Sequence, residues 1–280
     1  MLVIITNKYF YNAVKERHYV NSIHTVIDHQ GSILTSMEEI KGEAVRFFSD
    51  LLTHMPEDFT GVSVEGLKDL LPFRCSDPQQ ELLIAGVTET EVKKVIFSMP
   101  KEKSPGPDGY TVEFFKGAWS VIGKDLTIAV QSFFMFGFLP KGINTTILAL
   151  IPKKTDASEM KDYRPISCCN VLYKIISKIL ENRLKTILPS FIAPNQSAFI
   201  KDRLLMENLL LATELVKDYH KEGVSSRCAM KIDTSKAFDS VKWPFLLNVL
   251  KALNLPEKFM HLYSLFLGPS KWGACWIFSK

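Results

Sequence analysis

The stretch that most constrains the fold of this chain is a short apolar run that ends in a carboxylate. Cys228–Ile232 has the pattern of a buried strand, and Asp233 follows it directly. The chain then turns and enters a helix near Trp243-Pro244. A carboxylate at the tip of a buried strand is costly unless a positive group, such as a divalent cation, meets it. Taken alone, the pattern is better explained by Asp233 capping the turn and Asp239 being a solvated helix residue.

The residues around this pair change that interpretation. The sequence Asp-x-x-x-Ala-Phe-Asp that begins at Asp233 resembles the first palm motif of reverse transcriptases. The resemblance is closest to non-LTR (LINE-type) retrotransposons, particularly those of plants, and includes the Ser-Val-x-Trp that follows. It implies that Asp233 is catalytic and binds Mg²⁺, and that Phe238 lies under the incoming sugar and excludes a 2′-hydroxyl. Asp239 is expected to have a supporting role.

Composition excludes several other classes of protein. The cysteines are odd in number and lack Cys-x-x-Cys spacing, which argues against a disulfide partner or a zinc site (Cys75, Cys168, Cys169, Cys228, Cys275). We therefore expect a reducing, intracellular compartment, either nucleus or cytoplasm. No stretch reaches the length of a membrane span.

The net charge of +4 is unevenly distributed along the chain. Residues 1–140 carry 13 Lys+Arg against 18 Asp+Glu, whereas residues 141–236 carry 16 against 10. Phosphate binding favours a basic excess in that second region, although a solvated face explains it nearly as well.

The first part of the chain looks like a connector. A polar helix is predicted from Asn7, two short strands flank the turn at 28–31, and Glu38–Leu52 has the period of an amphipathic helix. His54–Glu81 is predicted to be a loop-rich linker. Residues 1–85 resemble the segment that joins the endonuclease to the polymerase in plant LINE proteins.

A second group of motifs follows the connector. Thr88 and Glu91 predict a capping box for a helix that ends near Ser98. The Ser-Pro-Gly-Pro-Asp-Gly loop after Lys103 is a tight turn by composition. Together with the Phe-Phe helix that comes next, it resembles the early fingers motif of non-LTR enzymes.

A strand covered on both faces is predicted for Thr145–Pro152, and it leads directly into Lys153-Lys154. Arg164 follows after a polar loop. These residues are equally well explained as a charged hairpin end. In the resembled family, the equivalent Lys and Arg bind the triphosphate of the incoming nucleotide, a role that suits a point charge and a forked guanidinium.

Two long helices are predicted next, over 171–188 and 205–221. In the first, Lys174, Lys178, Arg183 and Lys185 are expected on the surface. Between the helices, three residues match a template-contacting motif of the family (Gln196, Phe199, Arg203). That motif usually has Gly where Asp202 stands, and the added charge is expected to weaken template contact.

The resemblance ends before the palm is complete. The Ala-Asp-Asp hairpin that completes the metal site in reverse transcriptases is not found, and residues 268–280 form a divergent tail. We therefore expect an α+β, helix-rich chain with a small antiparallel sheet, forming a partial right-hand polymerase with fingers and an incomplete palm over 86–267. Its implied partners are an RNA template, a DNA primer and deoxynucleotides. The alternative is a non-catalytic remnant that only binds nucleic acid.

Overall fold

The structure is a computed structural model that describes residues 11–16, 22–54, 60–198, 200, 202–217, 219, 230, 232, 241–267 and 276–278. Residues 11–16 are helical. In chain order the elements are β1 (Val26–Ile27), β2 (Ile33–Leu34), α2 (Met37–Thr53), α3 (Val64–Leu70), α4 (Asp77–Ile84), α5 (Glu89–Ser98), α6 (Val112–Gly117), α7 (Trp119–Phe136), β3 (Thr146–Pro152), the 3₁₀ helix η1 (Met160–Asp162), β4 (Tyr163–Cys169), α8 (Val171–Ile187), η2 (Leu188–Ser190), α9 (Leu205–Val216), α11 (Trp243–Ala252), α12 (Glu257–Leu267) and β5 (Trp276–Phe278).

Two small sheets accompany these helices. β1 and β2 form an antiparallel hairpin in which Val26 pairs with Leu34. β3 and β4 are antiparallel over their full length, and β5 joins the other edge of β3 in parallel. The prediction of a helix-rich chain is therefore confirmed. The prediction of an antiparallel sheet holds for both hairpins but misses the parallel strand β5.

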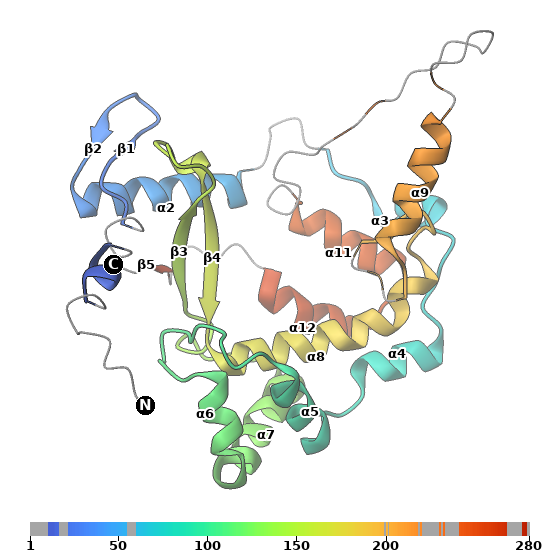
Figure 1. Ribbon diagram of the computed structural model, residues 1–280. Helices are drawn as coiled ribbons and strands as arrows, with labels where there is room; N and C mark the ends of the chain where they lie inside the picture. Colours follow the sequence, from blue (N-terminus) through green and yellow to red (C-terminus); the bar gives the residue numbers. More distant parts are fainter. Residues whose placement is uncertain are drawn as a thin grey trace, which may run out of the picture.

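The described buried side chains form two apolar clusters. In Figure 1, β1 and β2 lie beside the upper end of the β3–β4 hairpin, α2 passes across that end, and helices α5–α8 gather at its lower end. The larger cluster is helical and centres on the buried side chains of α8, which meet those of α4, α5, α7 and α12. The smaller cluster joins α2 and β1 to β3 and η1 (Val26, Ile40, Ala44, Phe48, Leu148, Met160). The end of the β3–β4 hairpin is thus attached to the N-terminal elements.

Local caps bound some of the helices, and one long helix agrees with its predicted range. Ser36 and Glu39 form a capping box at the start of α2. α7 ends at Gly137, whose φ of 63° is the left-handed conformation that glycine adopts without strain. The helix predicted over 171–188 corresponds to α8.

The prediction of a loop-rich linker over His54–Glu81 is wrong, because this segment contains α3 and most of α4. The Ser63 hydroxyl accepts the Gly66 N–H at 3.1 Å, and Ser76 forms a capping box with Gln79. Leu67 and Leu83 are buried, so packing completes what the short sequence pattern only weakly indicates.

Three other predictions need correction. Only the first half of β3 is covered on both faces, since Ile151 is 45% exposed. α9 ends at Val216, five residues before the predicted end at residue 221. Of the predicted buried strand, the described residues Met230 and Ile232 are not in a strand and are each 80% exposed, because no described element packs on them.

Candidate nucleic-acid interface

The end of the β3–β4 hairpin brings together the three cations predicted to bind phosphate. Ile151 pairs with Arg164, so Lys153 and Lys154 leave β3 beside the start of β4. The Lys153 N–H donates to the Asp162 carbonyl at 2.8 Å, and its ammonium donates to the Lys161 carbonyl at 2.7 Å. All three cationic side chains are exposed. The hairpin therefore presents Lys153, Lys154 and Arg164 to solvent from one end.

Asp162 organises the inside of this loop. Its side chain is buried, and one carboxylate oxygen accepts the N–H groups of Ser158 and Glu159, both at 3.2 Å. The same oxygen lies 3.3 Å from the Lys154 ammonium. Burial alone would raise the pKa of Asp162, but these N–H groups and Lys154 outweigh it, so the pKa lies below the ordinary aspartate value.

The charges of the loop are only partly neutralised. Lys161 pairs with Glu159 at 2.8 Å, and this contact raises the pKa of Lys161. Lys154 shares its charge with Asp162. Within the part of the chain that the structure describes, no carboxylate pairs with Lys153 or Arg164. An exposed ammonium and guanidinium without a local counter-charge can bind an anion such as phosphate.

The predicted template segment lies elsewhere, between η2 and α9. Arg203 donates to the carbonyls of Ala193 at 2.6 Å, Gln196 at 2.7 Å and Ile192 at 2.9 Å. Its guanidinium therefore holds the loop closed. The Gln196 amide is exposed and donates within the same loop, to Ala198, at 3.2 Å. Phe199 is outside the described residues.

Asp202, in the same loop, has a φ of 62°. This left-handed conformation is strained for most residues and free for glycine. The glycine that the resembled motif usually has at this position therefore suits the backbone of this turn.

The hairpin end and the template segment do not meet. β4 and then α8 lie between these two segments along the chain. The seven residues of β4 span about 23 Å, at ~3.3 Å per strand residue, and the 17 residues of α8 span about 25 Å, at ~1.5 Å per helix residue. In Figure 1 the hairpin end lies above the sheet, and α9 lies beyond the far end of α8. The structure thus presents two separate candidate surfaces.

Asn170, which the sequence analysis did not single out, anchors the Pro-Gly-Pro-Asp-Gly loop. Its buried side chain accepts the Asp108 N–H at 3.2 Å and donates to the Gly142 carbonyl at 2.9 Å. A Cβ built on Gly106 would lie 2.2 Å from the Asn170 side-chain oxygen, so only glycine fits there. The backbone of this tight turn at Gly106 therefore packs closely against Asn170, the residue just before α8. An Asn immediately before a helix is the only sequence signal for this role.

Arg183 was expected on the surface, and this prediction is wrong. The residue is 6% exposed, and its guanidinium binds both Glu91 carboxylate oxygens at 3.2 and 3.0 Å. Its other terminal nitrogen donates to the carbonyl oxygens of Leu83 and Ala85. Because Glu91 faces Arg183, it does not complete the predicted capping box, and only the Thr88 hydroxyl caps α5.

The predicted catalytic residues Asp233, Phe238 and Asp239 lie outside the described residues. Among the residues that are described, no group of three or more potential metal ligands is found, and no helix is long and apolar enough to cross a membrane. Cys75, Cys168 and Cys169 are free thiols. A magnesium site at Asp233 therefore remains a prediction from sequence.

Comparison with known proteins identifies the region that contains the hairpin cations. The reverse transcriptase (RNA-dependent DNA polymerase) family matches residues 151–278. This range includes Lys153, Arg164, the template segment and Asp233. This part of the chain is a reverse transcriptase domain of the type found in non-LTR retrotransposon polyproteins.

Curated relatives extend the similarity beyond that range. The chain is 31% identical, over 91% of its length, to an uncharacterized 149 kDa protein of transposon TX1 from Xenopus laevis. It is 29% identical over 66% of its length to the polyprotein of the R2DM element, and 27% identical over 65% to the RNA-directed DNA polymerase of the jockey element, both from Drosophila melanogaster. The chain covers 19%, 17% and 20% of these three proteins, so it spans about a fifth of their length.

Proposed function

We propose that residues 86–267 are the fingers and first part of the palm of an RNA-directed DNA polymerase from a LINE-type element, of the kind found in plants. Residues 1–85 would be the connector from an endonuclease region, and residues 268–280 a divergent tail. The observation that carries the proposal is that one family match contains both the cationic hairpin end and the Asp-x-x-x-Ala-Phe-Asp sequence.

In this proposal the hairpin end binds the triphosphate of the incoming deoxynucleotide. Lys153 and Arg164 support this role because they are exposed and lack a carboxylate partner among the described residues. Lys154 is held by Asp162 and contributes a partly neutralised charge. An ammonium and a forked guanidinium on one turn provide several donors to phosphate oxygens.

The remaining roles rest on the sequence resemblance. Asp233 would bind Mg²⁺, which neutralises phosphate charge when it is present. Phe238 would exclude a 2′-hydroxyl, and Asp239 would have a supporting role. Gln196 and Phe199 would contact the RNA template, with Arg203 holding their loop in shape through its three carbonyl contacts.

Binding of dTTP tests the triphosphate role. Lys153→Ala and Arg164→Ala should each weaken binding about tenfold, because one charge-assisted hydrogen bond is worth roughly 1.5 kcal/mol. Lys124→Ala, an exposed lysine on α7, is the matched control and should leave the dissociation constant unchanged. Isothermal titration calorimetry measures all of these constants, and equal affinities throughout would disprove the role.

A second candidate function is nucleic-acid binding without catalysis. It is favoured by the basic excess of residues 141–236, which carry 16 Lys+Arg against 10 Asp+Glu and can bind phosphates without any catalysis. Residues 1–280 should then fail to extend oligo(dT) on poly(A), and binding to RNA should weaken steeply with salt. Primer extension that disappears in Asp233→Asn would instead establish catalysis by this chain.

A further inference from the structure

The N-terminal hairpin is joined directly to the loop that carries the cations. The Ile27 N–H donates to the Ser158 carbonyl at 2.7 Å. Ile27 also forms a parallel bridge with Glu159. β1 therefore pairs with residues 158–159, which lie more than 130 residues further along the chain, and this pairing fixes one side of the loop.

An apolar contact supports the same junction. Val26, next to Ile27, is completely buried, and Met160, next to Glu159, is 2% exposed. Both belong to the cluster that also contains Phe48 of α2 and Leu148 of β3. The backbone pairing of β1 with the loop is thus flanked by buried apolar side chains, which hold β1 against the loop.

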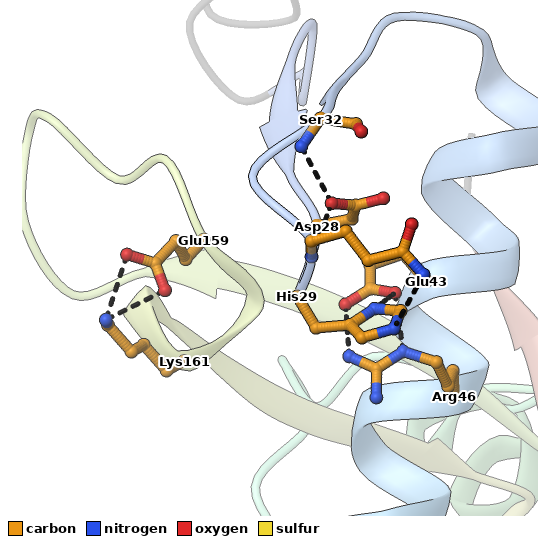
Figure 2. Close-up of polar contacts among 8 residues, drawn as sticks. Asp28, His29, Ser32, Glu43, Arg46, Glu159 and Lys161 are labelled. Atoms are coloured by element: carbon orange, nitrogen blue, oxygen red, sulfur yellow. Dashed lines mark hydrogen bonds and ion pairs between the residues drawn. The ribbon is translucent and has the colours of Figure 1, made fainter.

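Polar contacts hold the N-terminal hairpin to α2 on the opposite side (Figure 2). One Asp28 carboxylate oxygen accepts the N–H groups of Gln30 and Ser32, each at 2.8 Å, and closes the turn. Glu43 of α2 accepts two hydrogen bonds from Arg46, at 2.7 and 2.5 Å, and lies 3.7 Å from His29. In Figure 2 this group faces the loop that carries the Glu159–Lys161 pair. Residues 22–54 therefore form one braced unit, here called the N-terminal brace.

A short chain of contacts connects the brace to the lysines. Ser158 accepts from Ile27 through its carbonyl, while its N–H donates to Asp162. Asp162 in turn contacts the Lys154 ammonium, and its carbonyl accepts the Lys153 N–H. A shift of residues 158–159 would therefore move the groups that orient both lysines.

We propose that the N-terminal brace is a positioning element of the triphosphate site, and that Ile27 and Val26 set nucleotide affinity through the loop at 153–162. This inference rests on the proposed triphosphate role of Lys153 and Arg164. The brace touches no nucleotide itself. It reduces the conformational freedom that the cationic loop must lose on binding, so it lowers the entropic cost of binding.

The test removes the junction and leaves every cation in place. Ile27→Pro deletes the N–H that donates to Ser158, whereas Ile27→Val keeps it and serves as the matched control. Binding of dTTP and of inorganic tripolyphosphate should weaken about five- to tenfold in Ile27→Pro, because the loop then loses more conformational freedom on binding, and the worth of the one lost hydrogen bond sets the upper limit of this effect. Binding should remain unchanged in Ile27→Val. Hydrogen exchange at the Lys153 amide should accelerate only in the proline variant.

Val26→Ala provides an independent route that introduces no proline. It shortens a fully buried side chain at the same junction and should weaken triphosphate binding in the same direction. Far-UV circular dichroism and urea unfolding identify a variant that has lost its fold, and affinity is compared only between folded variants.

The possible outcomes separate the two proposals. If Lys153→Ala weakens binding but Ile27→Pro and Val26→Ala bind like the wild type, the positioning role is wrong and the triphosphate role stands. If wild-type binding does not depend on Lys153 or Arg164, the triphosphate role is wrong, and the positioning role falls with it. Weaker binding in both junction variants, with normal binding in Ile27→Val, supports the inference.

Discussion

Helices α8 and α9 are both rich in aliphatic residues, but only one of them is buried. α8 has seven buried residues, four of which are completely inaccessible (Val171, Ile175, Ile176, Ile179). α9 has no buried residue, and its leucines at 205, 209, 210, 211 and 215 are 57–67% exposed. Composition alone therefore does not decide which of the two helices enters the core.

Neighbours account for the difference. α8 contacts α4, α5 and α7, whereas the polar partners of its lysines are the Ser104 carbonyl and Glu181 of α8 itself. α9 follows the Arg203 loop and extends away from the helical group (Figure 1). An apolar side chain contributes to stability only where other side chains remove its surface from water. Substitutions in the two helices should therefore have very different effects.

The largest expected difference in stability is between two side-chain truncations, one in α8 and one in α9. Ile179→Ala in α8 should lower the free energy of unfolding by about 3 kcal/mol, because it leaves a cavity at a completely buried position. Leu210→Ala in α9, where the side chain is 63% exposed, should change it by less than about 0.5 kcal/mol. Urea unfolding followed by circular dichroism measures both. Equal losses would mean that α9 is buried in solution.

The buried cation of α8 should have the next largest effect. Arg183→Met removes two hydrogen bonds to Glu91 and leaves the Leu83 and Ala85 carbonyls without their donor. We expect a loss of about 2–3 kcal/mol. The control is Lys178→Met on the same helix, whose partner Glu181 lies 3.0 Å away at the surface, and it should cost under about 0.5 kcal/mol.

A double variant refines this comparison. If the uncompensated Glu91 charge causes part of the loss, Glu91→Gln should recover some stability in the Arg183→Met background. Thermal unfolding of the single and double variants measures this coupling. No recovery would assign the whole loss to the two carbonyls and to the contact of Arg183 with the Phe134 ring.

A smaller effect is expected in the loop that joins the two helices. Because Asp202 has a φ of 62°, Asp202→Gly should be more stable than Asp202→Ala by about 1 kcal/mol. Arg203 remains in place in both variants and continues to close the loop. Thermal unfolding of the two variants provides the measurement, and equal stability would show that the turn relaxes without strain.

The smallest effect is the part of the pH dependence of stability that Glu181 of α8 contributes. Burial alone would raise the pKa of Glu181, but Lys185 and Lys178 outweigh it, so its pKa is below the ordinary glutamate value. The stabilisation that ionised Glu181 contributes to the folded state is therefore complete above its pKa in the unfolded chain, about 4.3. It is lost as the pH falls through the lower pKa of Glu181 in the folded protein. For an exposed pair we expect Glu181 to contribute under about 0.5 kcal/mol, and the Glu181→Gln variant should lack this part of the pH dependence. Urea unfolding between about pH 6 and pH 3 tests it, with Glu214→Gln in α9 as the control.

Local sequence signals predicted some features well and others poorly. The helical periods of α2 and α8 were predicted well because they depend on residues within a few positions of one another. α3 and α4 were missed because they are short, and their formation depends on caps together with burial of Leu67 and Leu83. Arg183 was misplaced because helical periodicity does not distinguish a surface cation from one whose partner lies 92 residues away.

In the candidate site, too, the sequence predicted which residues take part but not which distant segments they contact. The residue types of the hairpin end were predicted from sequence, but their separation from the template segment and their attachment to the N-terminal brace were not. The use of the Arg203 guanidinium inside its own loop was also not predicted. The predictions for Asp233, Phe238 and Asp239 lie outside the described residues and stay predictions.

The sequence by itself determined the period of α2 and α8, the order of the motifs and the positions of the hairpin cations, because these depend on residues near one another in the chain. Only the tertiary structure decided that α8 is buried while α9 is exposed, that Arg183 meets Glu91, and that Ile27 binds the loop at Ser158. The physical reason is that burial and long-range hydrogen bonding depend on which distant segments become neighbours.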